Sequence, residues 1–219
     1  MNNVSNAIKL CLVTNRLNRS HQWLADIVKK AVLGGITMVQ LREKNLESDQ
    51  EFIDLANLLL KTLENFNIPL IINDRVDICQ IVNAHGVHLG QDDIHPDDAR
   101  KILGKNAIIG LSLESLGDAH LANKLESIDY VAASHVFSSR TKPNKTNPIH
   151  QDIWGIEGLK QLYSISKYPI ISIGGIDASN AAQVIEAGSS GIAVVSAILE
   201  SKSPELSANE LINIINIRK

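Results

Sequence analysis

The sequence predicts a (β/α)8 barrel, that is, a TIM barrel of the α/β class, and three observations support this prediction. Eight short runs rich in Ile, Leu and Val alternate with amphipathic segments along all 219 residues. Aromatic residues make up only 4% of the chain, so the core must be aliphatic, which is typical of parallel strands buried on both faces. The length fits one large domain over residues 1–219 better than two small ones.

The eight predicted strands are short apolar runs, and helical patterns lie between them. In chain order they are IKLCLVT, TMVQLRE, PLIIND, GVHLG, AIIGLSL, DYVAASHV, PIISIGG and GIAVVSA. After the first run, Leu24, Ile27, Val28 and Ala31 recur at helical spacing. Gly34, Gly104 and Gly188 each follow a helical stretch, where a left-handed C-cap is expected. The tail ELSANELINIINI is typical of a closing helix.

A doubly wound open sheet is the structural alternative. Such a sheet usually carries a G-x-G-x-x-G motif after its first strand, whereas TNRLNRS follows here, without glycine. We therefore favour the barrel. One long polar loop, residues 138–153, follows the sixth strand and contains Pro143 and Pro148. Loops of this length are often lids, so we expect a mobile active-site loop.

Charge and cysteine content narrow the classes of function. The net charge of −3 argues against a nucleic-acid footprint over the whole surface. No apolar run approaches the length of a membrane span, and Lys9 interrupts the apolar N-terminal stretch, so we expect neither a membrane protein nor a signal peptide. Cys11 and Cys79 lie outside any CxxC pair, which favours buried thiols in a cytoplasmic protein over a disulfide. A homo-oligomer remains open.

Polar residues follow the predicted strands, and the second strand carries the basic ones. Reactive groups of a (β/α)8 barrel gather at the carboxyl ends of its strands. Alternation in VQLREK places Gln40, Arg42 and Lys44 on one face, with Val39 and Leu41 on the other. Positive groups in the barrel mouth without an acidic partner would be costly unless they bind an anion. The alternative is an ordinary ion pair at the rim.

Carboxylates follow the next two strands. Asn73 and Asp74 end the third strand, and Asp92 and Asp93 follow the fourth. Because consecutive strands are neighbours in a barrel, these side chains should lie close together. Carboxylate and amide oxygens suit Mg²⁺, which then links protein to phosphate. The alternative for one of the paired aspartates is a charge at a helix N-terminus.

The remaining strand ends predict a second anion site. Strand five ends near Ser112, and the loop after strand six is rich in hydroxyl and basic residues, namely Ser138, Ser139, Arg140, Thr141, Lys142 and Lys145. A mobile basic loop beside a metal site can close over a diphosphate. After strands seven and eight, Gly174, Gly175 and Ser196 suit a backbone cradle for phosphate. Two phosphorylated ligands facing each other suggest a transfer that expels diphosphate.

Taken together, these motifs resemble thiamine phosphate synthase. The similarity covers nearly the whole chain, through VQLREK, IINDR, GVHLGQDD, IGLS, DYVAASHVFSSRTK, ISIGGI and GIAVVSAI in this order. It implies a (β/α)8 barrel enzyme with small-molecule substrates, a pyrimidine diphosphate and hydroxyethylthiazole phosphate. The products would be thiamine phosphate and diphosphate, formed by a dissociative, Mg²⁺-assisted mechanism without a protein nucleophile.

The resemblance also implies roles for particular residues. The diphosphate would be held by Arg42, Lys44, Asn73 and Lys142, and Mg²⁺ by Asp74 and Asp93. The pyrimidine would contact Gln40 and Ser112. The thiazole phosphate would bind Ser139, Thr141, Gly175, Val195 and Ser196. Among these, the resemblance assigns catalysis to Arg42, Lys44, Ser112 and Lys142.

The sequence departs from the usual family pattern in the loops, and two rivals remain. Ser134 stands where the family usually has glycine, Ser138-Ser139 replaces Pro-Thr, and Leu113-Glu114 replaces Thr-His. These differences concern loop contacts and the thiazole side. The nearest rival is thiazole tautomerase, a related barrel that uses a histidine at the position of His135. The other is a non-catalytic barrel that binds a phosphorylated ligand.

Overall fold

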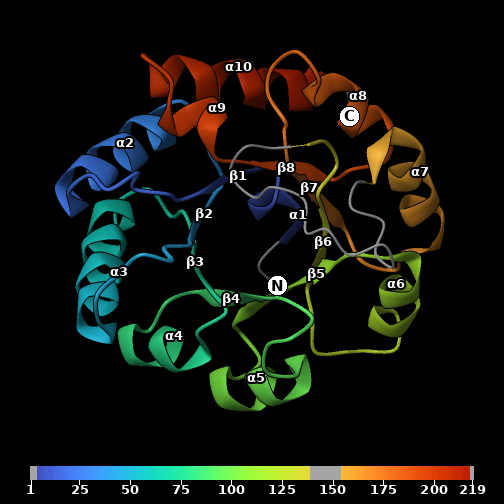
Figure 1. Cartoon of the computed structure of the whole chain (residues 1–219), viewed down its shortest axis with the longest axis horizontal. Coiled ribbons are helices and arrows are strands. Elements are labelled where there is room, and N and C mark those ends of the chain that lie inside the picture. The colour runs from blue at the N-terminus through green and yellow to red at the C-terminus, as the bar shows by residue number, and fades with distance from the viewer. Residues whose placement is uncertain (1–3, 139–153, 218–219) are drawn as a thin grey trace.

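The computed structural model describes residues 4–138 and 154–217, and its eight parallel strands close into a barrel (Figure 1). Each strand pairs with the next, and β8 pairs with β1. The strands are β1 (Leu10–Val13), β2 (Met38–Leu41), β3 (Leu70–Asn73), β4 (Gly86–Leu89), β5 (Ile108–Leu113), β6 (Tyr130–Ser134), β7 (Ile170–Ile173) and β8 (Gly191–Val194). All eight predicted strands are present, and the predicted (β/α)8 barrel is confirmed.

All helices except α1, which lies over the centre of the barrel, surround the strands, and polar caps fix where several of them begin (Figure 1). They are α1 (Val4–Ala7), α2 (His21–Leu33), α3 (Asp49–Leu63), α4 (Val76–Val82), α5 (Pro96–Leu103), α6 (Leu116–Ala122), α7 (Gly155–Ile165), α8 (Ala181–Glu186), α9 (Ser196–Leu199) and α10 (Pro204–Ile217). The hydroxyls of Ser20 and Ser48 accept hydrogen bonds from the amides of Trp23 and Glu51, in the first turns of α2 and α3. Ser115 and Asp118 form a reciprocal capping box on α6.

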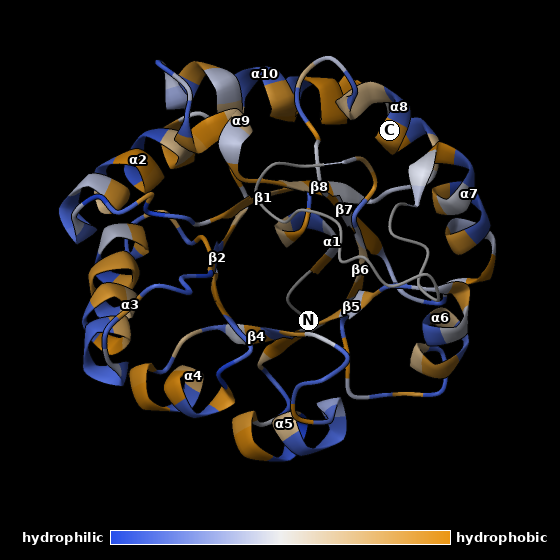
Figure 2. Ribbon diagram, viewed as in Figure 1, coloured by the Kyte–Doolittle hydropathy of each residue, from blue (hydrophilic) through white to orange (hydrophobic). Residues whose placement is uncertain are grey.

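The core has two parts because each strand faces both the helices and the barrel interior. Figure 2 shows apolar strands and helices that are apolar inside and polar outside. On β2, Val39 and Leu41 belong to the cluster between strands and helices, whereas Met38 belongs to the inner cluster. The predicted alternation of β2 is therefore confirmed, and Gln40 lies on the interior face above Met38.

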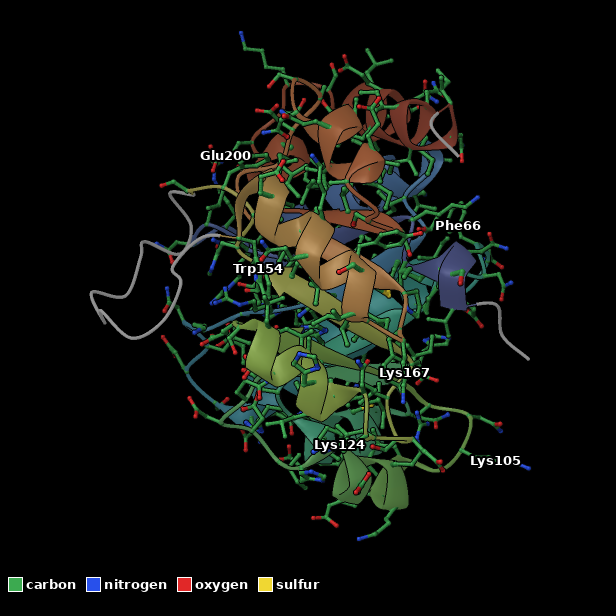
Figure 3. The ribbon with its side chains drawn as sticks, turned by 90° about the vertical axis from the view of Figure 1, so that its right-hand side faces the viewer. Phe66, Lys105, Lys124, Trp154, Lys167 and Glu200 are labelled. Atoms are coloured by element: carbon green, nitrogen blue, oxygen red, sulfur yellow. The ribbon has the colours of Figure 1, made fainter. Side chains whose placement is uncertain are left out.

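The two ends of the barrel differ in the segments that lie there. In Figure 3, Trp154 and Glu200 lie at one end, and Phe66, Lys105 and Lys167 lie at the other. At this second end Ile8, directly after α1, packs into the inner cluster, and the Thr37 hydroxyl donates to the Ala7 carbonyl at 2.7 Å. The first helix therefore closes the barrel opposite the carboxyl ends of the strands.

A guanidinium ties together the loops at this closed end. Arg100 contacts Asp129 at 2.7 Å and donates to the carbonyls of Gly104, Ala107 and Ser127 at 2.6 to 3.1 Å. Asp129 also accepts the Ile109 amide at 2.8 Å. These bonds join the ends of α5 and α6 to the starts of β5 and β6 and contain no group suited to chemistry. This is a structural ion pair.

The predicted left-handed cap is wrong at Gly34, whereas Gly104 and Gly188 have positive φ, at 81° and 106°. Gly34 has φ −77°, and Gly35 is the residue with positive φ, at 106°. Gly34 is needed for space, because a Cβ there would lie 2.2 Å from the Glu205 carbonyl oxygen of α10. The predicted buried thiols are confirmed, since Cys11 and Cys79 are both free and buried. In the described part of the chain, no helix combines the length and apolarity needed to cross a membrane.

Candidate active site

A cavity of about 690 Å³ opens at the carboxyl ends of the strands. Every described residue of the predicted site lines it, namely Gln40, Arg42, Lys44, Asn73, Asp74, Asp93, Ser112, Gly175, Val195 and Ser196. Ser139, Thr141 and Lys142 lie outside the described residues, as does most of the predicted loop lid at 138–153. The structure thus brings together segments from six strands that are far apart in sequence.

The basic residues after β2 face the cavity. The backbone amide of Arg42 donates to the Thr14 hydroxyl at 3.0 Å, which ties the end of β2 to the end of β1. Neither Arg42 nor Lys44 forms an ion pair with any residue among 4–138 and 154–217. The adjacent Glu43 turns away and accepts the Arg16 amide at 3.0 and 3.1 Å. The rim ion pair considered as an alternative is therefore absent from this part of the chain.

Asp74 and Asp93 face each other across the ends of β3 and β4. Asp74 has φ 64°, and its amide donates to the His88 carbonyl at 2.9 Å, so the chain turns sharply after Asn73. Asp93 accepts the Gly90 amide at 2.6 Å. Burial raises the pKa of Asp74 to about 6, helped by a hydrogen bond and charge repulsion from Asp93. Without a cation, Asp74 therefore keeps its proton to a higher pH than an ordinary aspartate does.

This pair fits Mg²⁺. Two facing carboxylates provide negative charge that a divalent cation can neutralise, and the cation can take the place of the proton on Asp74. In the described residues no group of three or more His, Cys, Asp or Glu side chains could form a closed metal site. Mg²⁺ commonly binds through one or two carboxylates, keeps waters and takes substrate phosphates. Asp92 also lines the cavity. Because α5 begins only at Pro96, neither Asp92 nor Asp93 caps that helix.

The side of the cavity formed by β2 to β6 contains a buried polar network that was not predicted from the sequence. Gln40 donates through Nε2 to Asn73 Oδ1 at 2.8 Å. His88 lies between Tyr130 Oη and Ser112 Oγ, at 2.9 Å from each. Burial lowers the pKa of His88 to about 4, so its imidazole is neutral at physiological pH. The signal was strand alternation, which places His88 inside the barrel while Val87 and Leu89 face the helices.

The opposite wall of the cavity is built from backbone. Gly174 and Gly175 have φ of 106° and 63°. A Cβ on Gly174 would lie 2.8 Å from His135 Cβ, and one on Gly175 would lie 2.6 Å from the Ser138 carbonyl oxygen. Both positions therefore require glycine for conformation and for space. A tight turn alone would explain one such glycine more easily than two.

The fold and this mouth define a class of protein, an enzyme-type (β/α)8 barrel with an anion-binding rim and paired carboxylates. The comparisons with known proteins identify the family. Residues 10–198 match the family described as thiamine monophosphate synthase. This chain belongs to the thiamine monophosphate synthase family.

Named relatives extend over nearly the whole chain. The thiamine-phosphate synthase of Chlamydia caviae is 40% identical over 208 residues, which cover 95% of each protein. That of Leptospira biflexa serovar Patoc is 45% identical over 197 residues, or 89% of this chain and 91% of the relative. The solved thiamine phosphate pyrophosphorylase from Pyrococcus furiosus has a TM-score of 0.85 and 31% identity, with 98% of each chain covered. The similarity therefore includes every strand that builds the mouth.

Proposed function

We propose that the mouth of this barrel joins 4-amino-5-hydroxymethyl-2-methylpyrimidine diphosphate to hydroxyethylthiazole phosphate with the help of Mg²⁺. The chain is a transferase of thiamine biosynthesis, and its products are thiamine phosphate and diphosphate. The observation that carries the proposal is the Asp74–Asp93 pair beside Arg42 and Lys44, two cations that form no ion pair within the described residues. Such an arrangement suits an anion that arrives with a divalent cation.

The basic side binds the diphosphate. Arg42 and Lys44 approach from β2, and Asn73 lies beside them at the end of β3. Their charges also lower the pKa of Asp74, which places them near the proposed metal carboxylates. Lys142 would join them from the loop at 138–153. Bound Mg²⁺ would supply positive charge that offsets the charge of the leaving group.

Gln40 and Ser112 orient the pyrimidine. As oriented, the Gln40 amide uses one N–H on Asn73 and keeps its carbonyl and second N–H for a ligand. An aminopyrimidine edge offers an amino donor beside a ring-nitrogen acceptor, which is the complementary pattern. Ser112 lies at the end of β5, where the Gln91 side chain donates to its carbonyl at 2.5 Å. Both side chains belong to the rigid barrel, which favours precise positioning.

The reaction needs no protein nucleophile. The carbon–oxygen bond between the pyrimidine methylene and diphosphate breaks, and its electron pair leaves with diphosphate. The resulting pyrimidine cation is stabilised by resonance, and the thiazole nitrogen donates its electron pair to form the new carbon–nitrogen bond. Arg42, Lys44 and Lys142 stabilise the charge that develops on diphosphate, so electrostatics and positioning provide most of the rate.

The glycine-rich wall holds the thiazole phosphate. Gly175 allows the backbone to approach the phosphate closely, and Val195 and Ser196 follow β8 on the same wall. The Gly175 amide has no acceptor among the described residues, so it is free for a phosphate oxygen. Ser139 and Thr141 would add hydroxyls from the loop. The two substrates then meet across the cavity.

The rival functions explain less of this site. His135 lines the cavity, as a thiazole tautomerase would require. Tautomerisation, however, has no use for a carboxylate pair and a basic diphosphate wall. A silent ligand-binding barrel would be expected to lose the carboxylates or the cations, and both are retained. A cytoplasmic location and a homo-oligomeric state stay predictions.

The test is a two-substrate assay with and without Mg²⁺. We expect thiamine phosphate only when both substrates and the cation are present. Asp93→Ala should lower turnover by roughly a hundredfold or more while the fold persists. Asp97→Ala, which removes an exposed carboxylate from the first turn of α5, is the matched control and should be active. Thiazole isomerisation without thiamine phosphate, or full activity of the Asp93 variant, would contradict the proposal.

A further inference from the structure

The ring of the buried histidine of β4 bonds neither the metal pair nor the phosphate wall, although the His88 carbonyl accepts the Asp74 amide. The His88 side chain is only 7% exposed, and both of its ring nitrogens have partners. Nδ1 lies 2.9 Å from the Tyr130 hydroxyl, and Nε2 lies 2.9 Å from the Ser112 hydroxyl. Because Ser112 lines the cavity, His88 connects a buried phenol to a side chain that can touch a ligand.

Strand register creates this connection. The ladders of β4, β5 and β6 place His88 opposite Gly110, and Gly110 opposite Tyr130. A Cβ on Gly110 would lie 2.1 Å from Tyr130 Cζ and 2.6 Å from His88 Nδ1. Only glycine therefore lets the two rings meet across β5, where their centroids lie 5.6 Å apart.

Counting hydrogens fixes the direction of each bond. Tyr130 is 0% exposed, and within residues 4–138 and 154–217 its hydroxyl has one hydrogen-bond partner, His88 Nδ1. A buried O–H without an acceptor is unfavourable, so the phenol donates to Nδ1. A neutral imidazole has one N–H, which must then be on Nε2 and must donate to Ser112 Oγ. An imidazolium, or the tautomer with hydrogen on Nδ1, would leave the phenol hydrogen unpaired.

We propose that His88 is a positioning residue that fixes the Ser112 hydroxyl as a hydrogen-bond donor toward the cavity. Ser112 Oγ accepts the Nε2–H bond, so the serine hydrogen is directed to the ligand. A fixed donor selects an acceptor at this position, such as an unprotonated ring nitrogen of the pyrimidine. The identity of that ligand rests on the proposed function, whereas the direction of the bonds does not.

The first test is nitrogen NMR of the ligand-free protein with ¹⁵N-labelled histidine. The His88 signals are those missing from the His88→Gln variant. We expect a neutral ring with hydrogen on Nε2 and none on Nδ1. A charged ring, or hydrogen on Nδ1, would overturn the proposal.

The second test compares two amide replacements. In His88→Gln the amide nitrogen reaches the place of Nε2 and can still donate to Ser112, whereas the Asn side chain is one methylene shorter. We expect His88→Asn to raise the KM for the pyrimidine diphosphate about tenfold, with the KM for thiazole phosphate unchanged, and His88→Gln to recover most of the loss. Equal losses on both substrates, or no rescue by glutamine, would indicate a packing defect and overturn the positioning role.

A third measurement uses substrate analogues and a milder variant. In the two analogues, one or the other pyrimidine ring nitrogen is replaced by C–H. The wild-type protein should lose about tenfold in kcat/KM on one of them. Tyr130→Phe removes only the phenol oxygen and should discriminate less between substrate and that analogue. No loss on either analogue, or unchanged discrimination in Tyr130→Phe, would refute the fixed donor. If wild-type protein makes no thiamine phosphate, the proposed function fails, and the NMR result still tests the bond directions.

Discussion

The affinity of the paired carboxylates for Mg²⁺ should depend on pH in a way that the geometry predicts. The pKa of Asp74 is raised from 3.8 to about 6, first by burial and then by Asp93. A cation must displace the proton of Asp74 before it can bind this carboxylate. At a pH one unit below this pKa, roughly one molecule in ten has Asp74 ionised. We therefore expect the apparent Mg²⁺ affinity to fall about tenfold per pH unit below about 6 and to level off above it.

Calorimetric Mg²⁺ titrations of the wild-type protein and of Asp93→Asn would measure this dependence. The variant removes the hydrogen bond and the charge repulsion that raise the pKa of Asp74, while burial remains. Its affinity should be weaker because one charged ligand is lost, and its pH dependence should begin at a lower pH. Asp97→Asn is the matched control and should behave as the wild-type protein. An affinity that is flat from about pH 5 to 8, or an unchanged Asp93→Asn profile, would refute the reasoning.

The folding stability of the metal-free protein should change with pH in the opposite direction to the Mg²⁺ affinity. Because the folded-state pKa of Asp74 lies above its ordinary value, the folded protein keeps a proton that the unfolded chain releases. The metal-free protein should therefore lose stability as the pH rises from 3.8 through about 6. Saturating Mg²⁺ should reverse this loss above that range, because it binds the ionised folded state. Urea unfolding with and without the cation would measure both effects.

Three further predictions, two of them with a control variant, test other parts of the molecule. Arg100→Met should lower the free energy of unfolding by about 2 kcal/mol, because it leaves a partly buried carboxylate and three carbonyls unpaired. Lys101→Met removes an exposed ion pair and should change the free energy of unfolding by about 0.5 kcal/mol or less. Gly34→Ala should lower the free energy of unfolding by about 1–3 kcal/mol, because the new methyl group overpacks against α10. Gly117→Ala should leave the stability unchanged or raise it, because a Cβ there would lie 3.4 Å from its nearest neighbour. Urea unfolding would measure both changes. Lys142→Ala should impair use of the pyrimidine diphosphate more than use of thiazole phosphate in steady-state kinetics, and an effect confined to the thiazole substrate would contradict its role.

The fold was predictable because each strand has a recognisable pattern in its own local sequence. Short apolar runs bounded by polar residues predict all eight strands, and alternation within β2 predicts which side chains face inward. The contacts with distant partners were not predictable. Gly34 resembles a helix cap in sequence, but the carbonyl of Glu205 on α10 makes glycine necessary there. Side-chain space between elements is not encoded in local periodicity.

The sequence indicated the candidate site residues that carry a charge at the end of a strand. It did not indicate the buried polar side chains that hydrogen-bond to each other. Arg42 and Asp93 attract attention because charged groups at strand ends need partners. His88 and Tyr130 satisfy each other, and no neighbouring residue in the sequence reveals that register brings them together. Lys142 lies outside the described residues, so its role stays a prediction.

The apolar side chains that line the cavity on its barrel-interior side affect which groups a reactive intermediate could contact. Val13, Ala132, Ile171 and Ala193 line the deep part of the cavity and offer no lone pair to an electrophilic carbon. Cys11 lies in the same inner cluster, and burial raises its thiol pKa far above the usual range, so it stays protonated. In the proposed reaction a pyrimidine cation would lie above these hydrocarbon side chains, and Cys11, which does not line the cavity, would not offer it a thiolate.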